Sequence, residues 1–357
     1  SDSKVLSEYS QALIREIRIR SKDWCFRDVD TVYIGGGTPS LMSAWDMGKI
    51  MDALRDNFNI VKDAEITIEG NPATLSDEKM ERYLRKGINR LSLGVQSFEN
   101  DVLQYLGRIH NKNDAFTSFQ RAKKAGFSNI NIDLMSAIPE QTYEGWEKNL
   151  RTVAALGPEH ISAYSLIVEE GTPFAAMAER GELPLPEEET ERAMYEETIE
   201  VLAKYGFHRY EISNYARDGY ECRHNVGYWI RRDYLGFGIG AASLIDNVRF
   251  QNEKSLGAYL AHPLESREEE QTLTVQDRME ETMFLGLRLT RGVSCVDFAE
   301  QYGRTVEEVY GEVIARNVAD GLLTVTERKE NQKKDRLLAL TKRGLDLSNY
   351  VMAQFLF

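Results

Sequence analysis

Cysteine is scarce in this chain of 357 residues, and its three cysteines lie far apart. Cys25, Cys222 and Cys295 have no CxxC-type spacing, so they indicate neither a disulfide framework nor a metal-cluster motif. Scattered thiols of this kind are typical of a reducing compartment. We therefore expect a cytoplasmic protein.

Basic residues and long apolar runs are also lacking. Lys and Arg number 44 against 57 Asp and Glu, which gives a formal net charge of −13. Binding along a phosphate backbone needs clustered basic residues, so we expect no nucleic-acid partner. No apolar run approaches the roughly 20 residues that span a bilayer, so we expect no membrane span.

What is present fits a globular α/β protein. Hydrophobic residues make up 42% and charged residues 28% of the chain, which is ordinary for such proteins. The length allows one large α/β domain of roughly 200–250 residues and a smaller one.

Short apolar strands alternate with helical patterns through the first 215 residues, after an opening helix over residues 2–24. The predicted strands are 31–34, 65–69, 90–94, 129–133, 160–165 and 209–213. The predicted helices are 45–58, 76–86, 98–106, 113–125, 143–155 and 187–205. This alternation indicates βαβ units and a parallel sheet. Six repeats favour a partial (β/α)6-type, TIM-like barrel, and because the series opens with a helix we expect it to lack its first strand.

The last third of the chain has a different pattern. A glycine-dense run at 236–243 is followed by a polar stretch at 265–271, which we interpret as a linker. We place the barrel at 1–250, the linker at 251–276 and a C-terminal domain at 277–357.

Three predicted helices in the C-terminal domain, at 277–287, 295–301 and 306–320, precede strands at 322–326 and 336–340. The charged residues 327–335 are predicted to form the turn between these strands. Helices followed by a hairpin are the outline of a winged-helix module. Such a module could recognise nucleic acid or a partner, but the acidic composition favours a small packing domain.

Three consecutive glycines, at 35–37, follow the strand at 31–34. Without Cβ atoms the backbone can approach a ligand closely, and its N–H and C=O groups become the recognising groups. An ordinary turn between a strand and a helix is the alternative.

Polar residues follow the next strands in turn. Glu69, Gln96 and Asp133 end successive strands, and Arg108 follows the third. The carboxyl ends of parallel strands in such a barrel gather at one mouth. Carboxylates accept from an ammonium group and from ribose hydroxyls, and arginine binds a carboxylate bidentately. The set therefore predicts a site for a small molecule with those groups, although a strand-end hydrogen bond explains any single residue equally well.

Several motifs in one colinear order resemble the radical S-adenosylmethionine (SAM) proteins related to oxygen-independent coproporphyrinogen III oxidase. These motifs are Gly35–Ser40, Glu69–Pro72, Gly94–Phe98, Leu106–His110 and Asp133–Met135. Further segments, Tyr210–Ala216, Cys222–Asn225, Tyr228–Trp229 and Tyr234–Gly238, resemble the haem chaperone branch of that family. The resemblance covers most of residues 1–350.

The resemblance implies a role for each matching residue. It implies that the backbone of Gly36, Gly37 and Thr38 holds the methionine amino group of SAM. The side chains that it implies as SAM ligands are Glu69, Gln96, Arg108 and Asp133, the last at the ribose. By a looser alignment, Ile167 and Ala242 supply apolar or backbone contacts around the adenosine.

One family motif has no match in this chain. The family carries a CxxxCxxC loop whose thiolates bind a [4Fe–4S] cluster, and the sequence has no such loop. We interpret this as an N-terminal truncation or an omitted loop, so that the intact protein would bind the cluster and this chain would not.

Haem is the cargo that the resemblance implies, with a haem-accepting protein as partner. His224 is a candidate iron ligand, since histidine, cysteine and tyrosine can all bind haem iron. A hydrogen-bonded loop histidine is the alternative. Arg223, Arg231 and Arg232 could pair with haem propionates, although a solvated basic patch is favoured.

Two other functions stay open at this point. The first is a true coproporphyrinogen III oxidase, which would decarboxylate propionate side chains with SAM. The second is an unrelated barrel enzyme whose glycine loop binds phosphate, for which residues 236–243 offer only Ser243 as a hydroxyl ligand.

Overall fold

The computed structural model describes residues 2–263, 267–330 and 333–357. The chain divides into two compact units, which we treat separately. The sheet unit comprises Trp24–Arg209 and Ser213–Glu221, and the winged unit comprises Ser1–Asp23, Tyr210–Ile212 and Cys222–Phe357.

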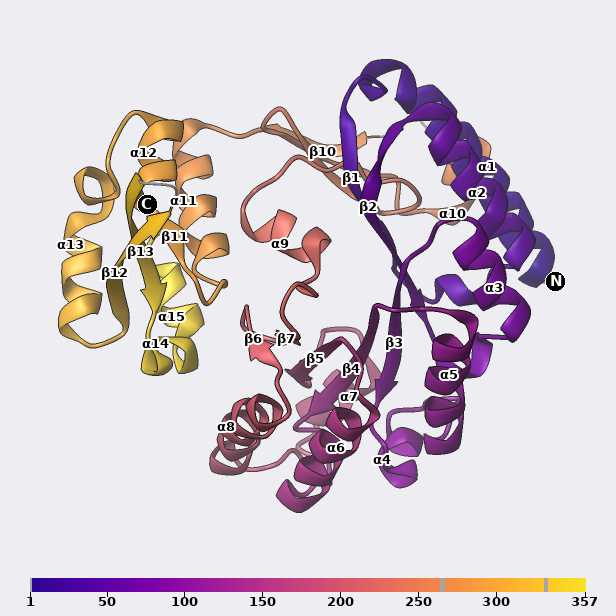
Figure 1. Ribbon diagram of the computed structural model, residues 1–357, viewed down its shortest axis with the longest axis horizontal. Coiled ribbons are helices and arrows are strands. Elements are labelled where there is room, and N and C mark those ends of the chain that lie inside the picture. The colour runs from indigo at the N-terminus through magenta and orange to yellow at the C-terminus, as the bar shows by residue number, and fades with distance from the viewer. Residues whose placement is uncertain (1, 264–266, 331–332) are drawn as a thin grey trace. The chain divides into compact units, whose positions relative to one another are not determined.

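A curled seven-stranded sheet, in the order β1-β2-β3-β4-β5-β7-β6, forms the sheet unit (Figure 1). Its first five strands run parallel. They are β1 (Asp28–Ile34), β2 (Asn59–Gly70), β3 (Arg90–Gln96), β4 (Ile130–Ser136) and β5 (His160–Ser165). The helices between and after them are α2 (Ala44–Asn57), α3 (Asp77–Arg85), α4 (Asn100–Tyr105), α5 (Lys112–Ala125), α6 (Tyr143–Leu156), α7 (Pro173–Glu179) and α8 (Glu188–Lys204). The half-barrel predicted from the sequence is thereby confirmed.

Local signals explain where these helices begin and end. Asn111 and Asp114 form a reciprocal capping box at the start of α5, and Gly126 ends the helix in the left-handed conformation. Helix α2 begins after Ser43, whose hydroxyl accepts from the Asp46 backbone N–H. Such caps fix the lengths of the connections that lead into the strands.

Apolar and polar side chains alternate along the parallel strands. Ile66 and Ile68 of β2, and Leu91 and Leu93 of β3, are at most 2% exposed. Because side chains of a strand point alternately to its two faces, the residues between them lie on the opposite face. Those residues are polar on neighbouring strands, and the register pairs Glu69 of β2 with Ser92 of β3, Ser92 with Asn131 of β4, and Asn131 with His160 of β5. One face of the sheet therefore builds a core with the helices, and the other presents polar groups.

The far edge of the sheet differs from the prediction. The strand predicted at 209–213 is wrong, and two short strands, β6 (His208–Arg209) and β7 (Asn214–Ala216), are present instead. Strand β7 pairs antiparallel with both β5 and β6. Between them, Tyr210–Ile212 belong to the winged unit, where Glu211 forms an isolated bridge with Leu289.

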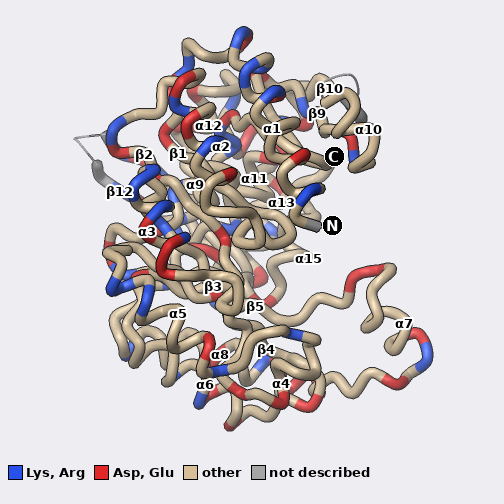
Figure 2. The backbone as a smooth tube through the Cα atoms, turned by 90° about the vertical axis from the view of Figure 1, so that its right-hand side faces the viewer, with Lys and Arg blue, Asp and Glu red and all other residues tan. Residues whose placement is uncertain are grey.

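Helix α7 was not predicted, and the segment that carries it projects from the rest of its unit (Figure 2).

The winged unit contains two sheets. One is a three-stranded sheet of β8 (Ala242–Ile245), β9 (Val248–Asn252) and β10 (Arg267–Thr272), in the order β10-β9-β8. The same unit contains helices α1 (Asp2–Trp24, of which this unit holds the residues up to Asp23), α9 (Arg223–Trp229) and α10 (Leu256–Ala261). Strand β10 falls in the stretch that we predicted as a linker, part of which, 264–266, lies outside the described residues. The domain limits at 250 and 276 stay predictions.

The second sheet, in the order β11-β13-β12, belongs to the C-terminal module. The module runs α11 (Val275–Gly286), β11 (Val293–Ser294), α12 (Cys295–Tyr302), α13 (Val306–Ala319), β12 (Leu323–Glu330), β13 (Lys333–Leu340), α14 (Lys342–Asp346) and α15 (Ser348–Ala353). A helix, a strand, two helices and a hairpin in this order are a winged-helix arrangement, as predicted.

The charged turn predicted at 327–335 is wrong, because both strands continue into it. Glu327 pairs with Arg336 and Arg328 with Asp335 across the hairpin. Opposite charges that face each other stabilise antiparallel strands, so charged residues here extend the hairpin. Residues 331–332 lie outside the described part of the chain. In the part that is described, no helix has both the length and the apolar character needed to cross a membrane.

Candidate functional site

The glycine loop after β1 depends on glycine for two different reasons. Gly36 and Gly37 have positive φ angles of 83° and 64°, which other residues rarely adopt. Gly35 instead has neighbours that leave no room for a side chain. A Cβ atom there would lie 2.8 Å from the Tyr33 ring and 2.9 Å from the Glu69 carboxylate.

Glu69, at the end of β2, is held by this loop. Its Oε1 accepts from the Tyr33 hydroxyl at 2.9 Å, and its Oε2 accepts from the Gly36 backbone N–H at 3.2 Å. Burial and the neighbouring carboxylates of Glu69 and Asp133 raise the pKa of Tyr33, so this hydroxyl stays a donor. The contact fixes the carboxylate at the carboxyl end of the sheet.

Gln96 ends β3 and is only 5% exposed. Its Oε1 accepts from the hydroxyl of Tyr164, on β5, at 3.0 Å. Tyr164 has a pKa raised to about 12, first by burial and then by the charge of Asp133. The charge of Arg108 acts in the opposite direction and lowers that pKa.

Asp133, on β4, accepts from Asn131 Nδ2 at 2.6 Å and from Ser92 Oγ at 3.4 Å. Its pKa is raised to about 6, chiefly by burial and to a smaller extent by the charge of Glu69. His160 continues this polar row, since its Nδ1 lies 2.6 Å from Asn131 Oδ1. Burial and the charge of Arg90 lower the pKa of His160 well below its usual value, so this ring is neutral.

Arg108 follows α4 and is half-buried. No hydrogen bond or ion pair of its guanidinium occurs among the described residues, so the cation is available for a ligand. The next residue but one, His110, is buried with Nε2 3.0 Å from the Val95 carbonyl oxygen. Burial lowers its pKa, and the contact anchors the loop that carries Arg108.

The structure thus brings three of the predicted side chains, those of Glu69, Gln96 and Asp133, to the ends of neighbouring strands, where Tyr33 and Tyr164 bond to the first two. Arg108 lies on the loop that His110 anchors to β3. Ile167 lies just after β5 and is 78% exposed. Ala242 begins β8 in the winged unit. No described contact links either residue to these four predicted side chains, and the SAM roles of all the predicted residues stay predictions.

Tyr33 and Tyr164 are the site residues that sequence reasoning missed. Tyr33 stands two residues before Gly35, and Tyr164 stands next to the end of β5. Their positions at strand ends were the available signal.

His224 lies in the winged unit, on α9. Its Nε2 is 2.9 Å from the Tyr228 hydroxyl, and the two rings meet edge to face with centroids 4.8 Å apart. Tyr228 meets Tyr234 in the same way at 4.7 Å. Trp229 lies beneath the guanidinium of Arg288, which is 4.2 Å from the ring centroid.

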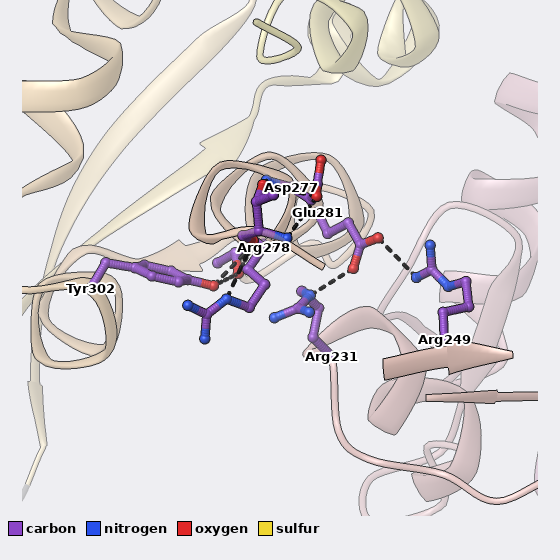
Figure 3. A network of polar contacts seen from close by, with 8 residues as sticks. Arg231, Arg249, Asp277, Arg278, Glu281 and Tyr302 are labelled. Atoms are coloured by element: carbon purple, nitrogen blue, oxygen red, sulfur yellow. Dashed lines mark hydrogen bonds and ion pairs between the residues drawn. The ribbon is translucent and has the colours of Figure 1, made fainter. Parts of the chain in front are cut away.

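The arginine at 231 does not form the solvated patch that we favoured. The Arg231 side chain is 4% exposed, and its Nε lies 2.8 Å from Oε2 of Glu281, on α11. Figure 3 shows that Glu281 also reaches Arg249, on β9, with Oε1 and Nη2 2.8 Å apart. One carboxylate therefore joins α11 to two basic residues elsewhere in its unit.

Comparison with known proteins shows to which family the chain belongs. The Radical SAM superfamily pattern matches residues 8–153, and the HemN C-terminal domain pattern matches residues 273–347. Heme chaperone HemW of Bacillus subtilis (strain 168) is 38% identical over 361 residues, which cover 99% of this chain and 92% of that protein. The chain belongs to the HemW family of radical SAM proteins.

Other relatives agree with this assignment. Heme chaperone HemW of Lactococcus lactis subsp. lactis (strain IL1403) is 36% identical over 98% of this chain and 90% of its own length. Among solved structures, coproporphyrinogen III oxidase (HemN) from Escherichia coli, described as a radical SAM enzyme, matches with a TM-score of 0.82 and 25% identity. The match covers 98% of this chain and 83% of that one.

Radical SAM proteins as a family use SAM and a [4Fe–4S] cluster, and the two fit this HemW-family chain differently. The strand-end donors and acceptors suit the groups of SAM. The three cysteines are free, and one is exposed, one buried and one half-buried. Among the described residues, no group of three or more His, Cys, Asp or Glu could hold a metal ion. The cysteines of this chain therefore do not fit a cluster.

Proposed function

We propose that this protein is a haem chaperone that binds SAM on its half-barrel and haem in its winged unit, for delivery to a haem-requiring protein. The observation that carries the proposal is the similarity to proteins named heme chaperone HemW along almost the whole chain. The three free cysteines suit a reducing compartment, and we place the protein in the cytoplasm.

The strand-end site supports the SAM part of the proposal. The Glu69 carboxylate accepts from an ammonium group, and the Arg108 guanidinium pairs with a carboxylate. Asp133 accepts from ribose hydroxyls, and the backbone of Gly36, Gly37 and Thr38 holds the methionine amino group of SAM.

Ile167, just after β5 in the same unit, would contact the adenosine. In radical SAM proteins the cofactors carry the one-electron chemistry, and the protein supplies binding and orientation.

The aromatic cluster on α9 supports the haem part. Imidazole and phenol are both ligands of haem iron, and aromatic rings pack against a porphyrin. His224 is the proposed ligand, held by its contact with Tyr228.

A haem titration tests this assignment. We expect the Soret band of haem to shift on addition of the chain, and His224→Ala to weaken binding at least tenfold. His262→Ala, a change of the same type at the end of α10, is the control and should bind haem like the unaltered chain. Equal binding by both variants would remove His224 from the haem site.

Coproporphyrinogen III oxidase activity is the second candidate, favoured by the structural match to HemN. The two candidates differ in the tetrapyrrole that they prefer. Under anaerobic conditions, coproporphyrinogen III should not displace haem from a chaperone. Displacement at stoichiometric concentration would favour the oxidase.

A further inference from the structure

Gln96 has a positive backbone φ angle, which residues other than glycine rarely adopt. Its φ angle is 68°, and it lies where the register of β3 against β4 shifts, between Leu93 and Gln96. A residue other than glycine is strained in this region, and such strain persists only where the surroundings determine the conformation. The position of the Gln96 side chain is therefore set by its neighbours.

Tyr164 is the neighbour that sets the orientation of the Gln96 amide. Among the described residues, its hydroxyl is the only hydrogen-bond partner of the Gln96 side chain, with Oε1 at 3.0 Å. An amide has an acceptor end and a donor end. When the oxygen accepts from Tyr164, the NH2 group is the end left for a ligand.

We infer that Tyr164 is a positioning residue, which orients Gln96 so that the site offers SAM a donor at this strand end. The inference rests on the proposed function, because it assigns part of the proposed SAM site. Gln96 NH2 and the Arg108 guanidinium then supply donors, while Glu69 and Asp133 supply acceptors. The ligand group that Gln96 binds is an acceptor, such as a carboxylate or hydroxyl oxygen.

A double-mutant cycle on SAM affinity, measured by calorimetry, tests whether Tyr164 acts through Gln96. Tyr164→Phe should weaken binding about two- to tenfold, the usual range for one neutral hydrogen bond. Gln96→Ala should weaken it by at least as much, and Tyr164→Phe should then add nothing. Effects that multiply would mean that Tyr164 acts independently of Gln96, and would overturn the inference.

Two further variants keep the test specific. Gln96→Glu retains an oxygen for Tyr164 but removes the donor, so we expect its affinity for SAM to fall as far as that of Gln96→Ala. Unchanged binding by Gln96→Glu would contradict the donor role. Tyr143→Phe is the matched control, since its hydroxyl donates to Glu197 at 2.8 Å, between α6 and α8. It should bind SAM like the unaltered chain.

A measurement without ligand separates this inference from the proposed function. In the free protein labelled at glutamine, the two side-chain N–H signals of Gln96 should be well separated, because the bond to its oxygen holds the amide in one orientation. Tyr164→Phe should move them toward free-amide positions, and Tyr143→Phe should leave them in place. If the chain fails to bind SAM the proposed function fails, and the Gln96 signals still decide whether Tyr164 orients the amide. Unmoved signals in Tyr164→Phe would overturn the inference.

Discussion

Two glutamates, one in each unit, show how a carboxylate whose acceptor positions are filled by the protein differs from one that can still bind a ligand. Glu16, on α1, is 0% exposed. Its Oε2 accepts from the Gly238 backbone N–H at 2.8 Å and the Tyr259 hydroxyl at 2.7 Å. Its Oε1 accepts from Asn252 Nδ2 at 2.8 Å and pairs with Arg20 Nε at 2.8 Å.

Among the described residues, Glu69 has half of that complement. It accepts from Tyr33 and from the Gly36 N–H, one at each oxygen. A carboxylate has about four acceptor positions, so Glu16 is saturated by protein groups and Glu69 has capacity left. The difference indicates that Glu16 stabilises the fold, while Glu69 can take hydrogen bonds from a bound molecule.

The largest effect should come from removing the saturated carboxylate. Glu16→Ala leaves the Arg20 charge buried without its counterion, so the free energy of unfolding should fall by about 3–5 kcal/mol, measured by urea denaturation. The matched control is Glu8→Ala on the same helix. Glu8 lies 3.7 Å from Lys4 with 49% of its side chain exposed, and its loss should cost less than about 1 kcal/mol. Equal losses would contradict the comparison.

The next effect depends on pH. The pKa of Asp133 is raised to about 6 in the folded protein from a usual value of 3.8. The folded state therefore binds this proton more tightly than the unfolded state, and the contribution to stability is present below pH 4 and lost as the pH rises through 6. Asp133→Asn should raise the free energy of unfolding at pH 7.5 by about 2–3 kcal/mol relative to the unaltered chain, with little difference at pH 4.

Urea unfolding of both proteins at the two pH values measures this difference directly. A constant difference across the range would mean that the Asp133 carboxyl titrates normally.

The smallest effect concerns space beside Glu69. Gly35→Ala forces the Tyr33 ring or the Glu69 carboxylate to move, because the new Cβ atom would lie within 3 Å of both. Such crowding costs about 1–3 kcal/mol, and we expect SAM affinity, measured by calorimetry, to fall about tenfold. Gly311→Ala, in α13, meets no atom within 4 Å and should leave the affinity unchanged. Normal binding by Gly35→Ala would show that Glu69 needs no fixed position.

Local patterns account for what the sequence predicted well. Apolar strands and capped helices alternate in the sheet unit, so most elements from α2 to β5 were found close to their true limits. Strand β2 is the exception, because it begins at Asn59, six residues before the predicted start. The motifs at the strand ends likewise placed Glu69, Gln96 and Asp133 at one edge, because parallel strands bring their carboxyl ends together.

Features that depend on distant residues were missed. The strands β6 and β7 have two and three residues, too few to show a period. The burial of Arg231 depends on Glu281, 50 positions later. The proposed role of Tyr164 depends on its contact with Gln96, and the two residues lie two strands apart in the sheet. None of these relations has a local signature.

The position of Glu281 bears on how the winged-helix module could be separated from the chain. The residue lies within the HemN C-terminal domain match, which begins at 273. A protein cut before that point would keep Arg231 but lose the carboxylate that balances its charge. Glu281 of the module thus serves as the counterion of Arg231, in the segment that follows α9. Without the module, that segment would need another acidic residue to fold as it does in the whole chain.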